Sequence, residues 1–269
     1  AVIDGRVISR VDPGNGFIAG GFVAFYSPTG ILVGSNASFD VAGLMLTTLD
    51  PDIGSFANFG SGGGTLNLIG AAGSASRVQI DSGARIVASG DGSFFIVAAP
   101  QVIMNGVADI NGSTAYVAGE RVDLTFSDGL FDIVIPIGTG VATAIDHNGA
   151  TGGPSSTGLG DNHVVYAVAR AETNPIQMLF GGNLGFAPAA VAGIDNGDII
   201  LAANFDVFGR SVNGGSVDQG LAAIFPDNAQ TSAVRADIAI DAFAATSDLM
   251  AVGTHATRAS AEAGSSAVA

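Results

Sequence analysis

Short segments with the composition of β-strands follow one another along the whole chain, and Gly, Asn, Asp or Ser separates most of them from the next. No segment predicts a convincing amphipathic helix, because Pro175 interrupts the candidate Ala171–Phe180. The predicted strands are Gly21–Tyr26, Gly30–Val33, Thr65–Ile69, Arg77–Ile80, Ala84–Ala88, Ser93–Ala98, Gln101–Met104, Thr114–Ala118, Arg121–Phe126, Asp132–Ile135, Val164–Val168, Ile176–Phe180, Asp198–Ala203 and Ala233–Ile240.

Similar sequences recur at short intervals. Val97–Val102 is similar to Val117–Val122, and Leu201–Phe205 is similar to Leu221–Phe225, each pair at a spacing of 20 residues. Gly83–Ile86 is similar to 106–109 at a spacing of 23. A repeat of this length is typical of one coil of a parallel β-helix, whose apolar column is buried only when coils stack. We therefore predict an all-β fold, a right-handed parallel β-helix with coils of about 20 residues. The alternative is a β-sandwich, which also uses short strands and Gly turns.

The composition argues against several kinds of partner and site. The 269 residues carry 24 acidic and 9 basic side chains, a net charge of −15, which argues against nucleic acid and anionic membrane surfaces as partners. The chain has no Cys, which excludes disulfides, thiolate metal sites and a Cys nucleophile. No apolar run reaches the roughly 18 residues of a membrane span. The sequence starts within an apparent strand, so we expect it to be a piece of a longer protein.

Several segments, in order, resemble a known family. Ser27-Pro28-Thr29-Gly30-Ile31 is followed by Val33–Ala37, Val41–Leu44 and Thr47–Asp50, and later by Val97–Val102, Val117–Phe126 and Asp128–Leu130. Together they resemble the two-partner-secretion domain of filamentous-haemagglutinin-like adhesins. That family has Asn-Pro-Asn-Gly-Ile where this chain has Ser27–Ile31. The resemblance covers residues 1 to about 136, and residues from there to 269 match only as a continuing shaft.

The resemblance implies a right-handed parallel β-helix that an outer-membrane β-barrel transporter exports to the surface of a Gram-negative bacterium or beyond. The secretion and turn motif would then be Ser27, Pro28, Thr29, Gly30 and Ile31, in which Pro28 pre-sets φ and Gly30 lets the chain reverse. A host-cell or matrix glycan or protein is the expected receptor, and end-to-end self-association is a further expectation. We predict an exported adhesin or shaft segment. The alternatives are a structural subunit of an extracellular fibre and a β-helix enzyme acting on glycans.

A polar, low-complexity stretch from His147 to Gly158 breaks the rhythm of strands and predicts a mobile loop that projects from the shaft. We accordingly divide the chain into a secretion-domain-like β-helix at 1–136, a polar loop and boundary at 137–163, and a continuing β-rich shaft at 164–269. Candidate binding residues on this surface loop are His147, Asn148, Asp161, Asn162 and His163.

Little in the sequence indicates catalysis. The paired carboxylates Asp50/Asp52, Asp128/Asp132, Asp195/Asp198 and Asp237/Asp241 flank turns, where Asp commonly binds backbone N–H groups. His147 and His163 bracket the loop and could together bind a metal, but a loop without a metal is the favoured interpretation. We predict no catalytic residues, no cofactor and no metal site.

Overall fold

The computed structural model describes residues 1–12, 14, 18–56, 59, 64–158, 160–188, 197–212, 215–216, 236–240, 244–245, 247–253, 256–258 and 267–268. Strands make up almost all of its regular structure, and the helix α1 (Ile53–Phe56) has only four residues. Within the described residues, no helix is long and apolar enough to cross a membrane. The predicted all-β class is confirmed.

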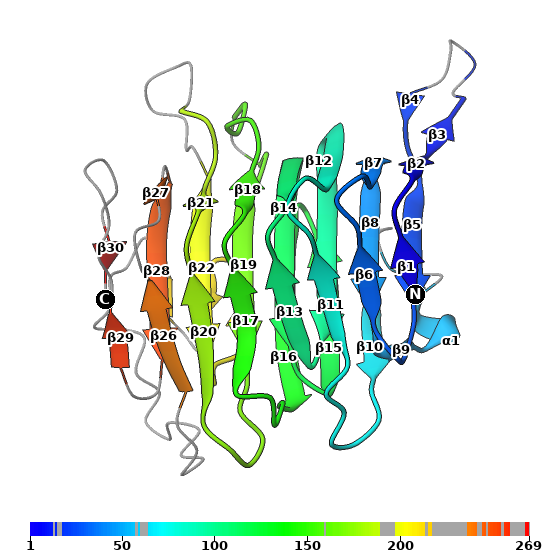
Figure 1. Cartoon of the computed structure of the whole chain (residues 1–269). Helices are drawn as coiled ribbons and strands as arrows, with labels where there is room; N and C mark the ends of the chain where they lie inside the picture. Colours follow the sequence, from blue (N-terminus) through cyan, green and yellow to red (C-terminus); the bar gives the residue numbers. More distant parts are fainter. Residues whose placement is uncertain are drawn as a thin grey trace.

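Parallel strands form the first sheet, sheet A. Neighbouring strands in it come from successive parts of the chain, and they lie side by side from the N-terminal to the C-terminal end (Figure 1). In order, they are β1 (Val2–Ile3), β6 (Ile31–Val33), β11 (Arg77–Ile80), β13 (Gln101–Met104), β17 (Thr143–His147), β20 (Ile176–Phe180), β26 (Ala236–Ile240) and β29 (Ala256–Arg258).

Sheet B is also parallel, and the chain enters it after leaving sheet A. Its main path is β2 (Arg6–Ile8), β7 (Ser38–Asp40), β12 (Arg85–Ala99), β14 (Val107–Ala118), β19 (Val164–Ala169), β22 (Asp198–Ala203), β28 (Asp248–Gly253) and β30 (Ala267–Val268). Shorter parallel strands extend it, namely β5 (Phe22–Tyr26), β8 (Gly43–Thr47), β18 (Ala150–Gly152), β21 (Asn183–Leu184) and β27 (Ala244–Ala245).

The chain thus alternates between sheets A and B, and each return pairs in parallel with the previous pass. This order is compatible with a β-helix. Phe95 pairs with Thr114, nineteen positions later, and Arg77 pairs with Gln101, twenty-four positions later, so a spacing of about 20 holds between these passes. Some passes are longer because antiparallel strands are inserted in them, such as β15 (Arg121–Ser127) and β16 (Leu130–Ile137) between β13 and β17. The pass from β17 to β20 contains no antiparallel strand, and His147 pairs there with Phe180, thirty-three positions later.

The observed register corrects the repeat read from the sequence. Val97 pairs with Tyr116, not Val117, and this one-residue difference turns Val97 and Val117 to opposite faces of sheet B. Val122 lies outside both parallel sheets. The step between Gly83–Ile86 and 106–109 has a register of twenty-two, because Arg85 pairs with Val107. Leu221–Phe225 falls outside the described residues.

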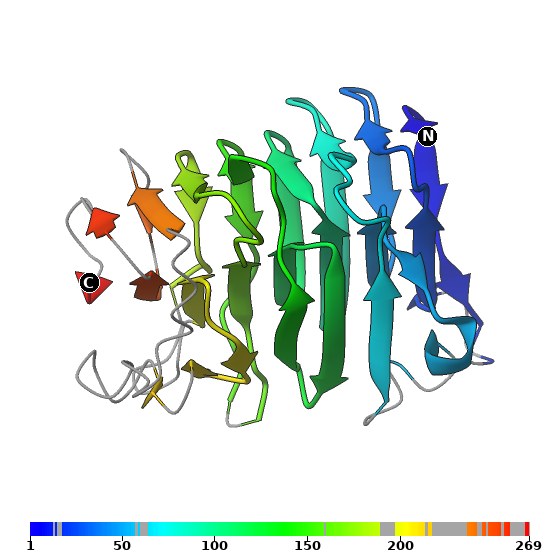
Figure 2. The same cartoon turned by 90° about the horizontal axis from the view of Figure 1, so that it is seen from below.

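The inserted strands form an antiparallel sheet, sheet D, beside sheet B (Figure 2). Its strands are β9 (Asp50–Pro51), β10 (Thr65–Ile69), β15 (Arg121–Ser127), β16 (Leu130–Ile137), β23 (Val207–Phe208), β24 (Ser211–Val212) and β25 (Gly215–Ser216). A separate hairpin joins β3 (Arg10–Val11) to β4 (Ile18–Ala19).

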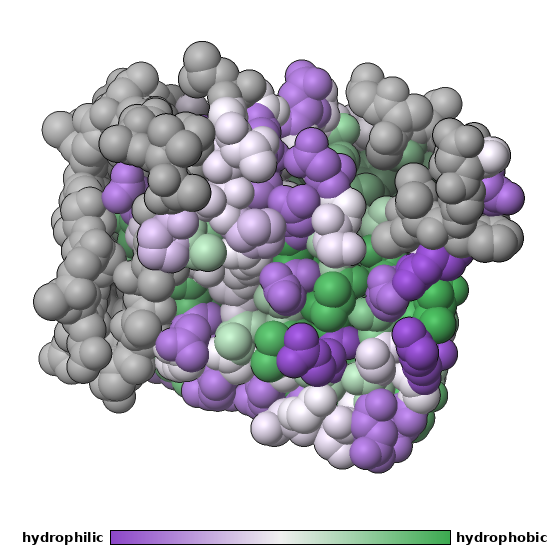
Figure 3. Space-filling model, turned by 90° about the horizontal axis from the view of Figure 1, so that it is seen from above, coloured by the Kyte–Doolittle hydropathy of each residue, from purple (hydrophilic) through white to green (hydrophobic). Residues whose placement is uncertain are grey.

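Two apolar cores result from the three sheets. One lies between sheets A and B and includes Val33, Ile80 and Phe95, and the other lies between sheets B and D and includes Ile96 and Leu124. Several strands of sheet B are buried on both faces, which explains continuous apolar runs such as β19. On the face seen from above, hydrophilic residues lie among hydrophobic ones (Figure 3).

Candidate functional site

The Ser27–Ile31 motif forms a tight turn between β5 and β6, as predicted. The Gly30 N–H donates to the Ser27 carbonyl oxygen at 3.1 Å, so Pro28 occupies the second position of a β-turn, where its fixed φ is favourable. Gly30 has φ of 120°, a conformation that suits glycine alone. Pro28 and Thr29 are exposed, while Ile31 is buried in the core between sheets A and B. The motif therefore presents its turn to solvent and anchors itself through Ile31.

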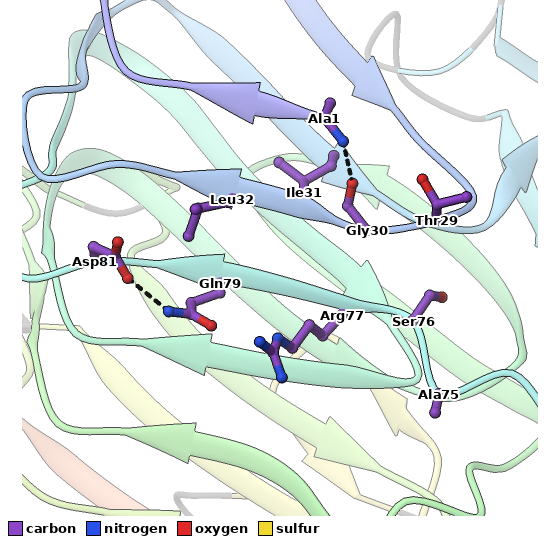
Figure 4. Close-up of a pocket in the computed structure, with 10 residues that line it drawn as sticks. All are labelled: Ala1, Thr29, Gly30, Ile31, Leu32, Ala75, Ser76, Arg77, Gln79 and Asp81. Atoms are coloured by element: carbon purple, nitrogen blue, oxygen red, sulfur yellow. Dashed lines mark hydrogen bonds between the residues drawn. The ribbon is translucent and has the colours of Figure 1, made fainter.

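A groove of about 470 Å³ runs beside this turn (Figure 4). The outward-facing side chains of β6 and β11 form its floor, since Leu32 pairs with Gln79. The Gln79 amide donates to Asp81 Oδ1 at 2.7 Å, and the Ser76 hydroxyl donates to Thr48 Oγ1 at 2.9 Å. The residues lining the groove are Ala1, Thr29, Gly30, Ile31, Leu32, Ala75, Ser76, Arg77, Gln79 and Asp81.

The chemistry of this groove suits binding. It offers an exposed guanidinium on Arg77, hydroxyl groups on Thr29 and Ser76, and the amide of Gln79. Among its lining residues there is no His or Cys, and the Asp81 carboxylate already accepts a hydrogen bond. Such a surface can recognise a polar segment of another protein by hydrogen bonding.

The structure corrects the placement of His147. The sequence predicts a projecting loop from this residue, but His147 ends β17 and is fully buried, and β18 follows from Ala150 to Gly152. The reason is the alternation within β17: Ile145 and His147 face the core and Asp146 faces outward. His147 occupies the same column as Met104 and Phe180, its partners in neighbouring strands. The alternation of Ile145, Asp146 and His147 is the sequence signal that would have predicted a strand here.

Hydrogen bonds fix the His147 ring. Nδ1 lies 3.2 Å from the carbonyl oxygen of Gly181, and Nε2 lies 2.9 Å from Thr151 Oγ1. The Thr151 hydroxyl in turn lies 2.7 Å from the hydroxyl of Tyr116, which is buried and whose pKa is raised by burial. Burial lowers the pKa of His147. Because both ring nitrogens already have partners, His147 is not available for the metal pair with His163 that the sequence left open.

The other candidate residues separate into two places. Asn148 is exposed at the turn after β17, where its amide donates to Asp146 Oδ1 at 2.7 Å. Asp161, Asn162 and His163 lie directly before β19. Asn162 donates to the carbonyl oxygen of Asp128 at 2.7 Å. His163 is fully buried, so it too is not a surface-loop residue. The division of the chain at residues 137–163 stays a prediction.

Two carboxylates of the predicted Asp pairs bind backbone N–H groups. Asp52 Oδ1 accepts from the Gly54 N–H at 3.0 Å, and Asp132 Oδ1 accepts from the Gly209 N–H at 2.8 Å. The expected capping of an adjacent turn is confirmed for Asp52, whereas Asp132 lies within β16 and binds the N–H of a glycine that is 77 residues away in the sequence. Asp195 and Asp241 fall outside the described residues.

Comparisons with known proteins leave the family open. No protein-family model matches the chain. The curated proteins contain no match either. Similar solved structures include the crystal structure of a filamentous hemagglutinin secretion domain, at 18% sequence identity and a TM-score of 0.39. That similarity covers 93% of this chain and 67% of the other. A likeness this distant assigns neither family nor function.

Proposed function

We propose that the chain is a non-catalytic, exported shaft segment of filamentous-haemagglutinin type. In this proposal the alternating sheets are coils of a right-handed parallel β-helix, and an outer-membrane β-barrel transporter recognises the exposed turn at Ser27–Ile31 during export. The shaft then carries receptor-binding loops away from the cell surface.

The observation that carries the proposal is the unbroken order of sheet A. Each of its strands pairs in parallel with the strand from the preceding pass, from β1 to β29, and the described inward side chains from Ile31 to Ile238 form an apolar column that only His147 interrupts. Hydrogen bonds and packing therefore link every pass to the next, which gives a stiff body suited to a mechanical role. The ordered motifs that resemble the secretion domain support the export step.

Export is testable at the turn. Thr29 is exposed, and Thr29→Asp changes the surface of the motif without removing Pro28 or Gly30. The producing organism's outer-membrane transporter would be coexpressed with the chain, and the extracellular fraction measured together with the melting temperature. We expect a loss of secretion of about tenfold, the change given by ~1.4 kcal/mol of lost contact energy, with unchanged melting.

The matched control is Thr173→Asp, which adds the same charge at an exposed position outside the motif and should secrete normally. Equal secretion of the two variants would show that the turn is not read by the transporter. The glycan-enzyme alternative would gain support only from hydrolysis or elimination of a glycan that an Asp→Asn variant abolishes.

A further inference from the structure

His163 is a buried imidazole whose Nδ1 has a hydrogen-bond partner and whose Nε2 faces a carboxylate. Nδ1 lies 2.9 Å from the carbonyl oxygen of Pro154. A carbonyl can only accept, so Nδ1 carries the proton, and when the ring is neutral Nε2 has a free lone pair. Nε2 is completely buried and takes part in no well-formed hydrogen bond. Phe186, whose ring lies 5.4 Å from the imidazole, covers the ring.

Nε2 faces a carboxylate. Asp161 Oδ1 lies 2.9 Å from Nε2, so in the neutral ring two acceptor atoms face each other at hydrogen-bond distance. The other oxygen, Oδ2, accepts from both the backbone N–H and the hydroxyl of Thr157, at 2.6 Å and 2.9 Å. Thr157 thus holds the carboxylate with Oδ1 toward the imidazole. This arrangement is repulsive unless a proton or a cation lies between the two atoms.

A second carboxylate completes the cluster. Asp91 lies where β12 departs from its regular pairing between Ala88 and Ser93, and this irregularity brings its side chain to the corner near β19. Ligand atoms of Asp91, Asp161 and His163 all lie within 4.8 Å of one another. Asp91 is exposed, which leaves one side of the cluster open to water.

We propose that Asp91, Asp161 and His163 bind a divalent transition-metal ion of the Zn²⁺ class. Imidazole nitrogen and carboxylate oxygen are ligands of such ions, and the Nδ1–H to backbone carbonyl bond is the outer contact that typically orients a ligating histidine. With metal–ligand bonds of about 2.1 Å and angles of about 90–110°, neighbouring ligand atoms lie about 3.0–3.4 Å apart. The observed separation of 2.9 Å between His163 Nε2 and Asp161 Oδ1 is just below that range, and the ligand atoms of all three residues lie within 4.8 Å, so Asp91 would move inward on metal binding. Water fills the remaining position or positions.

Such a site would have a structural role. Its ligands come from β12 and from the segment before β19, so the metal joins parts of the chain that are far apart in the sequence. The overall charge of −15 favours cation binding further. The sequence predicts no metal, because Asp91 is far from His163 along the chain and only the irregularity in β12 brings it near.

Titration of the metal-free 269-residue chain with Zn²⁺ tests the proposal, with Co²⁺ as a spectroscopic probe. We expect one saturable site per chain, visible d–d absorption with Co²⁺, and an X-ray absorption signature of one imidazole with oxygen ligands. Asp91→Asn, at an exposed residue whose loss leaves the core intact, should weaken Zn²⁺ binding about tenfold or more. Asp50→Asn, which removes the same charge from an exposed residue of β9, should bind within about twofold of the unmodified chain.

His163→Gln gives a second test, with circular dichroism to show that the variant folds. Its Co²⁺ spectrum should lose the imidazole contribution. Two outcomes would overturn the proposal: no saturable Zn²⁺ binding, or equal affinity in Asp91→Asn and Asp50→Asn. In the first case, ¹⁵N NMR showing both His163 nitrogens protonated would establish an imidazolium–Asp161 ion pair in place of the metal.

Discussion

Gly30 lies against the carbonyl oxygen of Arg77 in the neighbouring strand of sheet A, so closely that a Cβ on Gly30 would be 3.2 Å from that oxygen. The same glycine has φ of 120°. Both the space and the backbone conformation therefore require a residue without a side chain at the end of the Ser27–Ile31 turn.

We predict that Gly30→Ala lowers the free energy of unfolding by about 1–3 kcal/mol, because alanine is strained at this φ. Urea denaturation measures the change. Gly5→Ala is the matched control, since Gly5 has no such φ and no atom lies within 4 Å of its added Cβ. An equally small effect of both substitutions would contradict the strained-turn account.

The packing of sheet D on sheet B gives a second prediction. Phe131 is fully buried and its ring lies 4.6 Å from that of Phe126 and 5.7 Å from that of Tyr166. Phe131→Ala should cost about 3–5 kcal/mol, through lost burial and the cavity left behind. Phe208, in the neighbouring strand β23, is 48% exposed, so Phe208→Ala should cost less than about 1 kcal/mol. Similar losses for the two would mean that sheet D does not cover the second core.

The buried hydrogen-bond chain gives a third prediction. Thr151 sits between Tyr116 and His147, so Thr151→Val deprives both of a partner, while Tyr116→Phe leaves the Thr151–His147 contact in place. We expect the free energy of unfolding to fall by about 0.5–1.5 kcal/mol for Tyr116→Phe and by about 2–4 kcal/mol for Thr151→Val. Chemical denaturation of both variants at pH 7 makes the comparison. The reverse order of losses would contradict the observed chain of contacts.

His147 also predicts a dependence of stability on pH. Burial holds its pKa in the folded protein below the ordinary value of 6.5, so below about pH 6.5 the unfolded chain binds more protons at this site than the folded chain does. The folded protein therefore has its full stability with respect to His147 above pH 6.5, and it loses stability as pH falls from there toward the pKa of His147 in the folded protein. Within that window the slope for one proton is at most about 1.4 kcal/mol per pH unit.

The control for this titration is His147→Gln, which removes the titrating ring. Unfolding free energies of both proteins between pH 7.5 and 5 isolate its contribution as their difference. That difference should shrink as pH falls. A constant difference would show that His147 does not titrate in this window.

Strand positions could be predicted well from the sequence. Thr65–Ile69, Arg77–Ile80, Gln101–Met104, Ile176–Phe180 and Asp198–Ala203 begin and end where composition and flanking turn residues placed them. Local patterns suffice here because each strand is short and is bounded by Gly, Asn, Asp, Ser or Pro. The predicted strands Ala84–Ala88 and Ser93–Ala98 merge into β12, whose irregularity retains the turn-like residues between them.

Register and sheet membership were harder to predict. Val97 and Val117 occupy the same place in two similar sequence segments, but Val97 faces the core between sheets A and B and Val117 faces the core between sheets B and D. Strands β10 and β15 have the same alternation as the strands of sheet A, yet they pair antiparallel in sheet D. No local signal distinguishes these cases, because the choice depends on which apolar faces remain to be covered once the parallel sheets have formed.

Immunogold electron microscopy of the producing cells, with antibodies raised against this chain, tests the central claim most directly. The account predicts gold along thin, stiff rods that are anchored at one end to the cell surface. Gold on long filaments with a regular axial repeat would favour a structural fibre subunit over a shaft. Gold confined to the cell interior would contradict the account, because the chain would then not be an exported shaft.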